Sequence, residues 1–136
     1  MKKVTCSQDV FELYYKELSP RRHEAFMVVL VSSQSEILGD KLVGLGGKAE
    51  CIIEPSQIFR YVLLEAAPRM ILIHNHPSGN TCPSPNDVEL TKRLAEIAEL
   101  VGVCLLDHVI IGDGYSSMRD LGLLPEPELY LERAAE

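Results

Sequence analysis

The chain has 136 residues, of which 46% are hydrophobic and 24% charged, a balance typical of one globular domain with a single core. Its 13 Lys and Arg against 20 Asp and Glu give a formal net charge of −7, which disfavours non-specific binding to nucleic acid because the overall field repels phosphate backbones. The four cysteines form no C-x-x-C, and we expect them to be reduced thiols. No signal peptide is recognisable, so we expect a cytoplasmic protein. No run reaches the roughly 18 apolar residues of a membrane-spanning helix, so we expect no membrane association.

The first part of the chain is predicted to form a helix and a β-hairpin. The helix is expected over Asp9–Leu18, after a short polar segment that can cap it. The apolar run Ala25–Val31 predicts a strand buried on both faces, and Ile37–Val43 predicts a second strand that pairs with it through a polar turn. A third short strand is expected to include Cys51–Ile53.

The second part alternates helices with apolar strands. We expect, in chain order, a helix over Pro55–Ala67, a strand over Met70–Ile73, a helix that Ser84 caps and Gly102 ends, a strand over Val103–Ile111 and a short strand around Tyr115. This order predicts an α+β or α/β fold, a mixed β-sheet flanked by helices in a single domain. The domain is expected to cover residues 1–124, with residues 125–136 as a charged tail.

The string His74-Asn75-His76, with Asp87 eleven positions after the second histidine, predicts a metal site. Residues i and i+2 point the same way only in an extended backbone, and Pro77 disfavours helical geometry at His76. Asp87 is expected in the first turn of the following helix. Two imidazoles and one carboxylate, with a fourth position left open, form a pattern typical of catalytic zinc.

Each of these residues also has a simpler interpretation when taken alone. Ser84-x-x-Asp87 resembles a capping box, and an acidic residue in the first turn of a helix is favoured by the helix dipole. A single histidine at the edge of a loop is ordinary. Capping does not explain two histidines on one side of an extended segment followed by a returning carboxylate, so the combination favours a metal site.

The pattern H-x-H, ten residues, D, with Ser84 three positions before Asp87, resembles the JAB/MPN (JAMM) metalloprotease motif. A longer set of strings resembles the RadC family of bacterial MPN-type domains: His74-Asn75-His76-Pro77-Ser78-Gly79, Pro83-Ser84, Glu54-Pro55 and Leu105-Leu106-Asp107-His108. The resemblance covers about Asp9 to Leu124. RadC proteins usually carry a helix-hairpin-helix segment before this domain, and the chain starts directly at the MPN-like part, as a fragment or a short relative would.

The resemblance implies a zinc-dependent hydrolase with a JAB/MPN-like fold that acts on a peptide or protein substrate. His74, His76 and Asp87 would bind Zn²⁺, and the metal would activate a water molecule. A glutamate upstream would act as the general base. Glu24, just before the first strand, fits this role best, and Glu54 is its rival. Ser84 would stabilise the developing oxyanion.

Three residues near the motif keep open roles. Asp107 and His108 are neighbours in a predicted strand, so at most one of them faces the site, where it could orient a zinc ligand; a hydrogen-bonded structural pair is the alternative. Cys82 lies close enough in sequence to approach the ion. The other functions to weigh are a non-catalytic zinc-containing interaction module and a DNA-repair-associated role, which rests on the family label alone.

Overall fold

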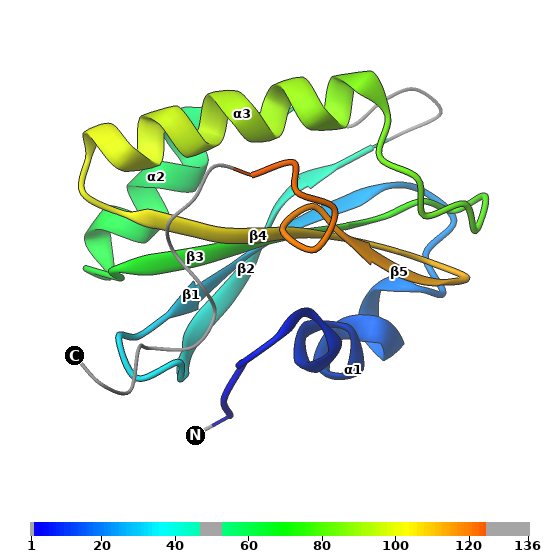
Figure 1. Ribbon diagram of the computed structural model, residues 1–136, viewed down its shortest axis with the longest axis horizontal. Coiled ribbons are helices and arrows are strands. Elements are labelled where there is room, and N and C mark those ends of the chain that lie inside the picture. The colour runs from blue at the N-terminus through cyan, green and yellow to red at the C-terminus, as the bar shows by residue number, and fades with distance from the viewer. Residues whose placement is uncertain (1, 47–52, 125–136) are drawn as a thin grey trace.

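The computed structural model describes residues 2–46 and 53–124, which form three helices and five strands (Figure 1). In chain order the elements are α1 (Ser7–Leu18), β1 (Ala25–Val31), β2 (Ile37–Leu45), α2 (Pro55–Leu64), β3 (Arg69–Asn75), α3 (Pro85–Leu100), β4 (Cys104–Gly112) and β5 (Gly114–Ser117). The predicted α+β class with a mixed sheet is therefore confirmed.

The five strands form one sheet in the order β2-β1-β3-β4-β5. Only β3 and β4 run parallel, and the other neighbouring pairs are antiparallel. The right-handed crossover rule places the helix between two parallel strands on one face, and Figure 1 shows α2 and α3 together on one face and α1 on the other. The central strands β1 and β3 are buried throughout, as a sheet covered on both faces requires.

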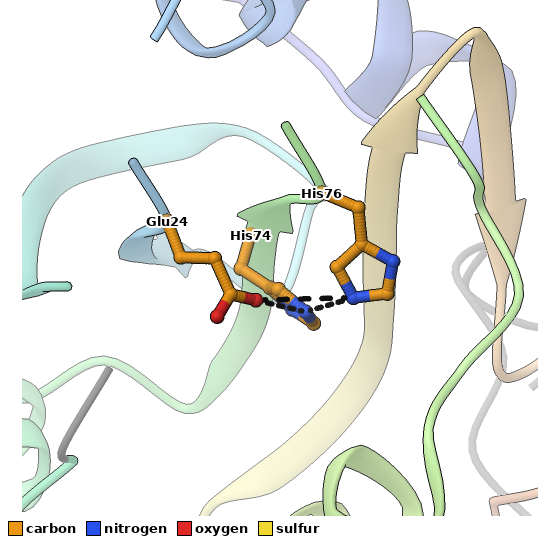
Figure 2. Close-up of side chains that lie close together, drawn as sticks. All are labelled: Glu24, His74 and His76. Atoms are coloured by element: carbon orange, nitrogen blue, oxygen red, sulfur yellow. Dashed lines mark hydrogen bonds and ion pairs between the residues drawn. The ribbon is translucent and has the colours of Figure 1, made fainter. Parts of the chain in front are cut away.

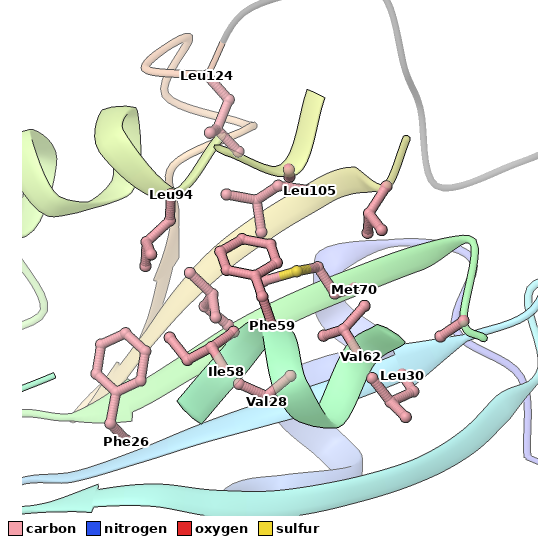
Figure 3. Close-up of a cluster of buried hydrophobic side chains, with 14 of the residues drawn as sticks. Phe26, Val28, Leu30, Ile58, Phe59, Val62, Met70, Leu94, Leu105 and Leu124 are labelled. Atoms are coloured by element: carbon pink, nitrogen blue, oxygen red, sulfur yellow. The ribbon is translucent and has the colours of Figure 1, made fainter. Parts of the chain in front are cut away.

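The core is divided by the sheet into two hydrophobic clusters. Alternate residues of β1 point to opposite faces, so Phe26 and Val28 pack under α2 and α3, whereas Met27 and Val29 pack against α1. Figure 3 shows the first cluster, in which Phe59 from α2 meets side chains of the sheet. Burial on both faces explains why β1 and the first part of β3 appear in sequence as solid apolar runs instead of alternating patterns.

A β-bulge interrupts the pairing of β3 with β4. Met70 pairs with Leu105 and Ile71 with Asp107, so Leu106 is an extra residue in β4. Beyond it, Leu72 pairs with His108. The bulge reverses the alternation of β4, and His108 consequently faces the side of the sheet that α2 and α3 cover.

The structure corrects several predicted boundaries. Helix α2 ends at Leu64 and not at Ala67, because Ala66 adopts a left-handed conformation with φ 52° and the amides of Ala66 and Ala67 bond back to the carbonyls of Leu63 and Val62, in a Schellman-type ending. Ile53 is not in a strand; the rest of that predicted strand, and the predicted tail 125–136, lie outside the described residues. Within residues 2–46 and 53–124, no helix has both the length and the apolar character that crossing a membrane requires.

Candidate metal centre

The C-terminal end of β3 carries both histidines. His74 lies inside the strand, paired with Phe26 of β1, and His76 follows the strand and donates its backbone N–H to the carbonyl of Ile111 at 2.8 Å. The backbone is therefore extended across both residues, as predicted. The two side chains point the same way and their Nε2 atoms lie 3.0 Å apart.

Asn75, between the histidines, holds the segment that carries Glu24. Its side chain is buried on the opposite face, where Oδ1 accepts from the backbone N–H of Ala25 at 2.7 Å and Nδ2 donates to the carbonyl of His23 at 3.1 Å. These bonds fix the backbone on both sides of Glu24 next to β3. Sequence reasoning missed this role; the only signal is a polar residue at a position of the strand that has to be buried.

The first turn of α3 brings Ser84 and Asp87 to the histidines. Ser84 is the N-cap, and the two residues form a reciprocal capping box: Ser84 Oγ accepts from the N–H of Asp87 at 3.0 Å, and Asp87 Oδ2 accepts from the N–H of Ser84 at 2.9 Å. Capping occupies one oxygen of the carboxylate. Asp87 Oδ1 remains directed at His74, so capping and metal binding are compatible roles of the same side chain.

Two carboxylates surround the pair of imidazoles. Asp87 Oδ1 lies 3.4 Å from His74 Nε2 and Asp87 Oδ2 lies 3.2 Å from His76 Nε2, whereas Glu24 Oε1 lies 3.8 and 3.9 Å from the same two nitrogens. Figure 2 shows the Glu24 carboxylate pointing toward both rings. Glu24, His74 and His76 each offer a ligand atom within 4.8 Å of the others, so this group can hold a metal ion.

The distances fit the donor set that zinc prefers. Bonds of about 2.0–2.2 Å in a tetrahedral site separate neighbouring ligand atoms by about 3.3–3.6 Å. The separations between His74, His76 and Asp87 are close to this range, and those to Glu24 are slightly longer. Two imidazole lone pairs 3.0 Å apart repel each other unless a proton or a cation lies between them, so the arrangement itself calls for positive charge.

Hydrogen bonds to the outer ring nitrogen determine which nitrogen of His76 faces the site. Nδ1 lies 2.8 Å from the carbonyl oxygen of Asn80, which can only accept, so Nδ1 carries the proton and the neutral ring presents Nε2. The hydrogen bond to Asp87 raises the pKa of His76 above its usual 6.5. Burial by itself raises the pKa of Asp87, but hydrogen bonds from His74 and His76 outweigh it and hold that pKa well below the ordinary value of 3.8.

Of the two neighbouring residues Asp107 and His108, only His108 faces the site. His108 Nε2 lies 2.7 Å from His74 Nδ1, and burial, followed by the nearby His74, keeps its pKa well below 6.5, so the ring is neutral. Asp107 points to the α1 face, where it accepts from the backbone N–H groups of His108 and Arg119 and from the hydroxyl of Ser117. The expectation that at most one of the pair faces the site agrees with this geometry.

A cavity of about 340 Å³ opens above these groups. Its lining combines the polar residues with an apolar wall and consists of Glu24, Phe26, Ile53, His74, His76, Ser84, Asn86, Asp87 and Leu90. The rival base Glu54 is exposed and does not line this cavity. Cys82 is also exposed, and its thiol lies against the carbonyl of Pro83 at 3.7 Å, away from the group of potential ligands.

Comparisons with known proteins identify the family of this chain. A family model described as RadC-like JAB domain matches residues 4–123. The chain is 35% identical over 124 residues to a UPF0758 protein of Methanosarcina mazei, covering 90% of the chain and 54% of that protein. A UPF0758 protein of Enterococcus faecalis is 39% identical over 119 residues, which are 87% of the chain and 51% of the relative. The chain thus spans about half the length of these relatives, and it belongs to the RadC family of JAB domains.

Proposed function

We propose that this domain is a zinc-dependent hydrolase of the JAB type that cleaves a peptide or isopeptide bond, with His74, His76 and Asp87 as the metal ligands. The observation that carries the proposal is the convergence of two imidazole Nε2 atoms and the Asp87 carboxylate at 3.0–3.4 Å around one point. The RadC-like JAB family supports it, because the resemblance that identifies the family implies this chemistry.

Asp87 completes the ligand set better than Glu24 does. Its oxygens lie 3.4 Å from His74 Nε2 and 3.2 Å from His76 Nε2, close to the separation between neighbouring ligand atoms in a tetrahedral zinc site, and the capping box holds its carboxylate in place. Glu24 lies farther out, at 3.8–3.9 Å, and its side chain is more exposed, at 27% against 16%. A carboxylate one step outside the ligands and open to the cavity is suited to proton transfer.

Hydrolysis of an amide adds water to the carbonyl carbon and breaks the C–N bond, so one proton has to pass from the water to the leaving amine. A bound zinc ion would supply Lewis acidity, lowering the pKa of water to about 7 and polarising the carbonyl. Glu24 accepts the proton and delivers it to the amine. Ser84 Oγ accepts from the N–H of Asp87, so its own hydroxyl proton is free to donate to the oxyanion.

The cavity favours a short piece of polypeptide as the substrate. Its volume of about 340 Å³ is near the lower end of the range for ligand pockets, about 300–1,000 Å³. Phe26, Ile53 and Leu90 form an apolar wall beside the polar groups, which suits a side chain next to the scissile bond. The net charge of −7 disfavours a nucleic-acid substrate for this domain.

The test is metal analysis followed by turnover of a panel of peptide and isopeptide substrates. We expect one zinc per chain, and we expect Glu24→Gln to keep the zinc and lose turnover by about 10²–10⁴-fold. Glu54→Gln is the matched control, because it removes an exposed glutamate at the start of α2 and should leave turnover unchanged. Protein without stoichiometric zinc would contradict the site; zinc-loaded protein that cleaves no substrate would favour the non-catalytic module.

A further inference from the structure

A buried chain of hydrogen bonds leads away from the proposed zinc ligands into α3. His74 Nδ1 lies 2.7 Å from His108 Nε2, His108 Nδ1 lies 2.6 Å from Thr91 Oγ1, and Thr91 Oγ1 lies 2.6 Å from the carbonyl oxygen of Asp87. The side chains of His74, His108 and Thr91 are 3%, 0% and 1% exposed. Water therefore cannot replace a missing partner along this chain.

The carbonyl oxygen of Asp87, at the end of this series of hydrogen bonds, determines which atom donates in each of them. A backbone carbonyl can only accept, so the single hydroxyl proton of Thr91 is donated to Asp87. Thr91 Oγ1 then has to accept from His108 Nδ1–H, which leaves Nε2 of the neutral His108 ring as an acceptor. His108 Nε2 in turn accepts from His74 Nδ1–H. The lone pair of His74 is thereby placed on Nε2, which faces the site.

We propose that Thr91 and His108 are positioning residues that hold His74 in its metal-binding tautomer and orientation, an inference that rests on the proposed function. Phe26 assists by packing against both rings, stacked on His74 at 5.5 Å and edge-on to His108 at 5.2 Å. The series of hydrogen bonds also begins and ends at proposed ligands, since it connects His74 on β3 to Asp87 on α3. Outer partners of this kind typically change metal affinity by about 10–100-fold when they are removed.

Thr91→Val tests the direction of the chain without touching a ligand. Valine has nearly the shape of threonine but leaves His108 Nδ1–H without an acceptor, and a buried N–H without a partner is disfavoured. The His108 proton then moves to Nε2, which donates to His74 Nδ1 and shifts the His74 proton to the nitrogen that faces the metal. Thr91→Ser is the matched control, because it keeps the hydroxyl.

Zinc affinity is measured by competition with a chelator, and the histidine tautomers are measured by long-range ¹H–¹⁵N NMR of the metal-free protein. We expect wild type and Thr91→Ser to show His108 as the Nδ1–H form and to bind zinc similarly. Thr91→Val should move His108 toward the Nε2–H form and bind zinc about 10–100-fold more weakly. Equal zinc affinity in all three proteins, or a wild-type His108 that carries its proton on Nε2, would overturn the inference.

A second pair of variants covers the case in which Thr91→Val does not fold. His108→Gln places an amide oxygen near the position of Nε2 and keeps an acceptor for His74, whereas His108→Leu removes it. Zinc affinity should be largely retained in the first and lost by about 10–100-fold in the second; equal affinities would contradict the role of His108. If the wild type binds no zinc at all, the proposed function fails, and the metal-free NMR still reports whether the chain of hydrogen bonds has the inferred direction.

Discussion

Replacing Asp87 by asparagine separates the two roles of this side chain, helix capping and metal binding. Asparagine keeps an oxygen that can accept from the N–H of Ser84 but loses the negative charge, which contributes about 0.3–1 kcal/mol near a helix N-terminus, so the cap itself should lose less than about 1 kcal/mol. The charged hydrogen bond to His76 at 3.2 Å is lost, and such bonds contribute about 1.5–3 kcal/mol. Because both side chains are 16% exposed, we expect a loss of about 1–2 kcal/mol in the metal-free protein near pH 6.

The stabilisation by bound zinc should differ more between the wild type and Asp87→Asn than the stability of the metal-free proteins does. At a free zinc concentration of about 100 times the Kd, binding stabilises the wild type by about 2.7 kcal/mol. A variant whose affinity is about 100-fold weaker gains only about 0.4 kcal/mol at the same concentration. For a domain of this size, 1 kcal/mol corresponds to about 3–5 °C in Tm, so the zinc-induced shift should fall from about 10 °C to about 2 °C.

The assay is thermal unfolding followed by circular dichroism, with chelator and with zinc. Asp9→Asn is the matched control: Asp9 lies in the first turn of α1 and accepts from the N–H and hydroxyl of Thr5, at 2.8 and 2.9 Å. Its zinc-induced shift should equal that of the wild type. A full shift in Asp87→Asn would refute the reasoning and make Glu24 the third ligand, with His74 and His76.

Three further predictions address the surroundings of the metal site. Ser84→Ala should lower the free energy of unfolding by about 1 kcal/mol through the lost cap, and turnover by about 10²–10³-fold through the lost oxyanion donor, with zinc content unchanged; an undiminished kcat would remove Ser84 from the reaction. The hydrogen bond from His76 to the neighbouring carboxylate is the largest cause of the raised pKa of His76. The stabilisation of the metal-free fold that this shift implies is fully present below the unfolded pKa of 6.5, and it is lost as the pH rises through the raised pKa. Zinc competes with that proton, so over the same interval the zinc-induced shift in Tm should grow; a shift that is flat in pH would contradict this assignment. Gly112→Ala should weaken zinc binding, because a Cβ would meet the backbone oxygen of Gly79 at 2.5 Å and displace the loop after His76. Gly39→Ala, whose Cβ meets only the tip of a tyrosine side chain, should bind zinc normally in the same titration.

The three inner strands, β1, β3 and β4, could be predicted from sequence because they are buried on both faces. Runs such as Ala25–Val31 contain enough apolar residues to exclude a loop and are too short for a typical helix. The end of α2 could not be predicted, since Ala66 adopts a left-handed conformation without the glycine that usually marks one.

The candidate ligands were accessible to sequence reasoning because they lie close together in the chain. Strand geometry relates His74 to His76, and one loop returns Asp87. Glu24 was a weaker inference, since its approach depends on pairing between β1 and β3, and the contact that secures it comes from Asn75. Thr91 carries no signal at all, because a threonine within a helix has no distinctive pattern until the strand opposite it is known.

The bulge at Leu106 has a consequence for the register in which β4 can pair with β3. Side chains of a strand alternate between the two faces of the sheet, and in β4 this alternation is shifted by one residue after the bulge. A strand of the same composition that paired regularly, with Leu106 opposite Ile71, would exchange the environments of Asp107 and His108. A carboxylate would then lie beside His74, and an imidazole would be left among the partners of Asp107 on the α1 face. At this position the register of the strand therefore matters as much as the identity of its residues.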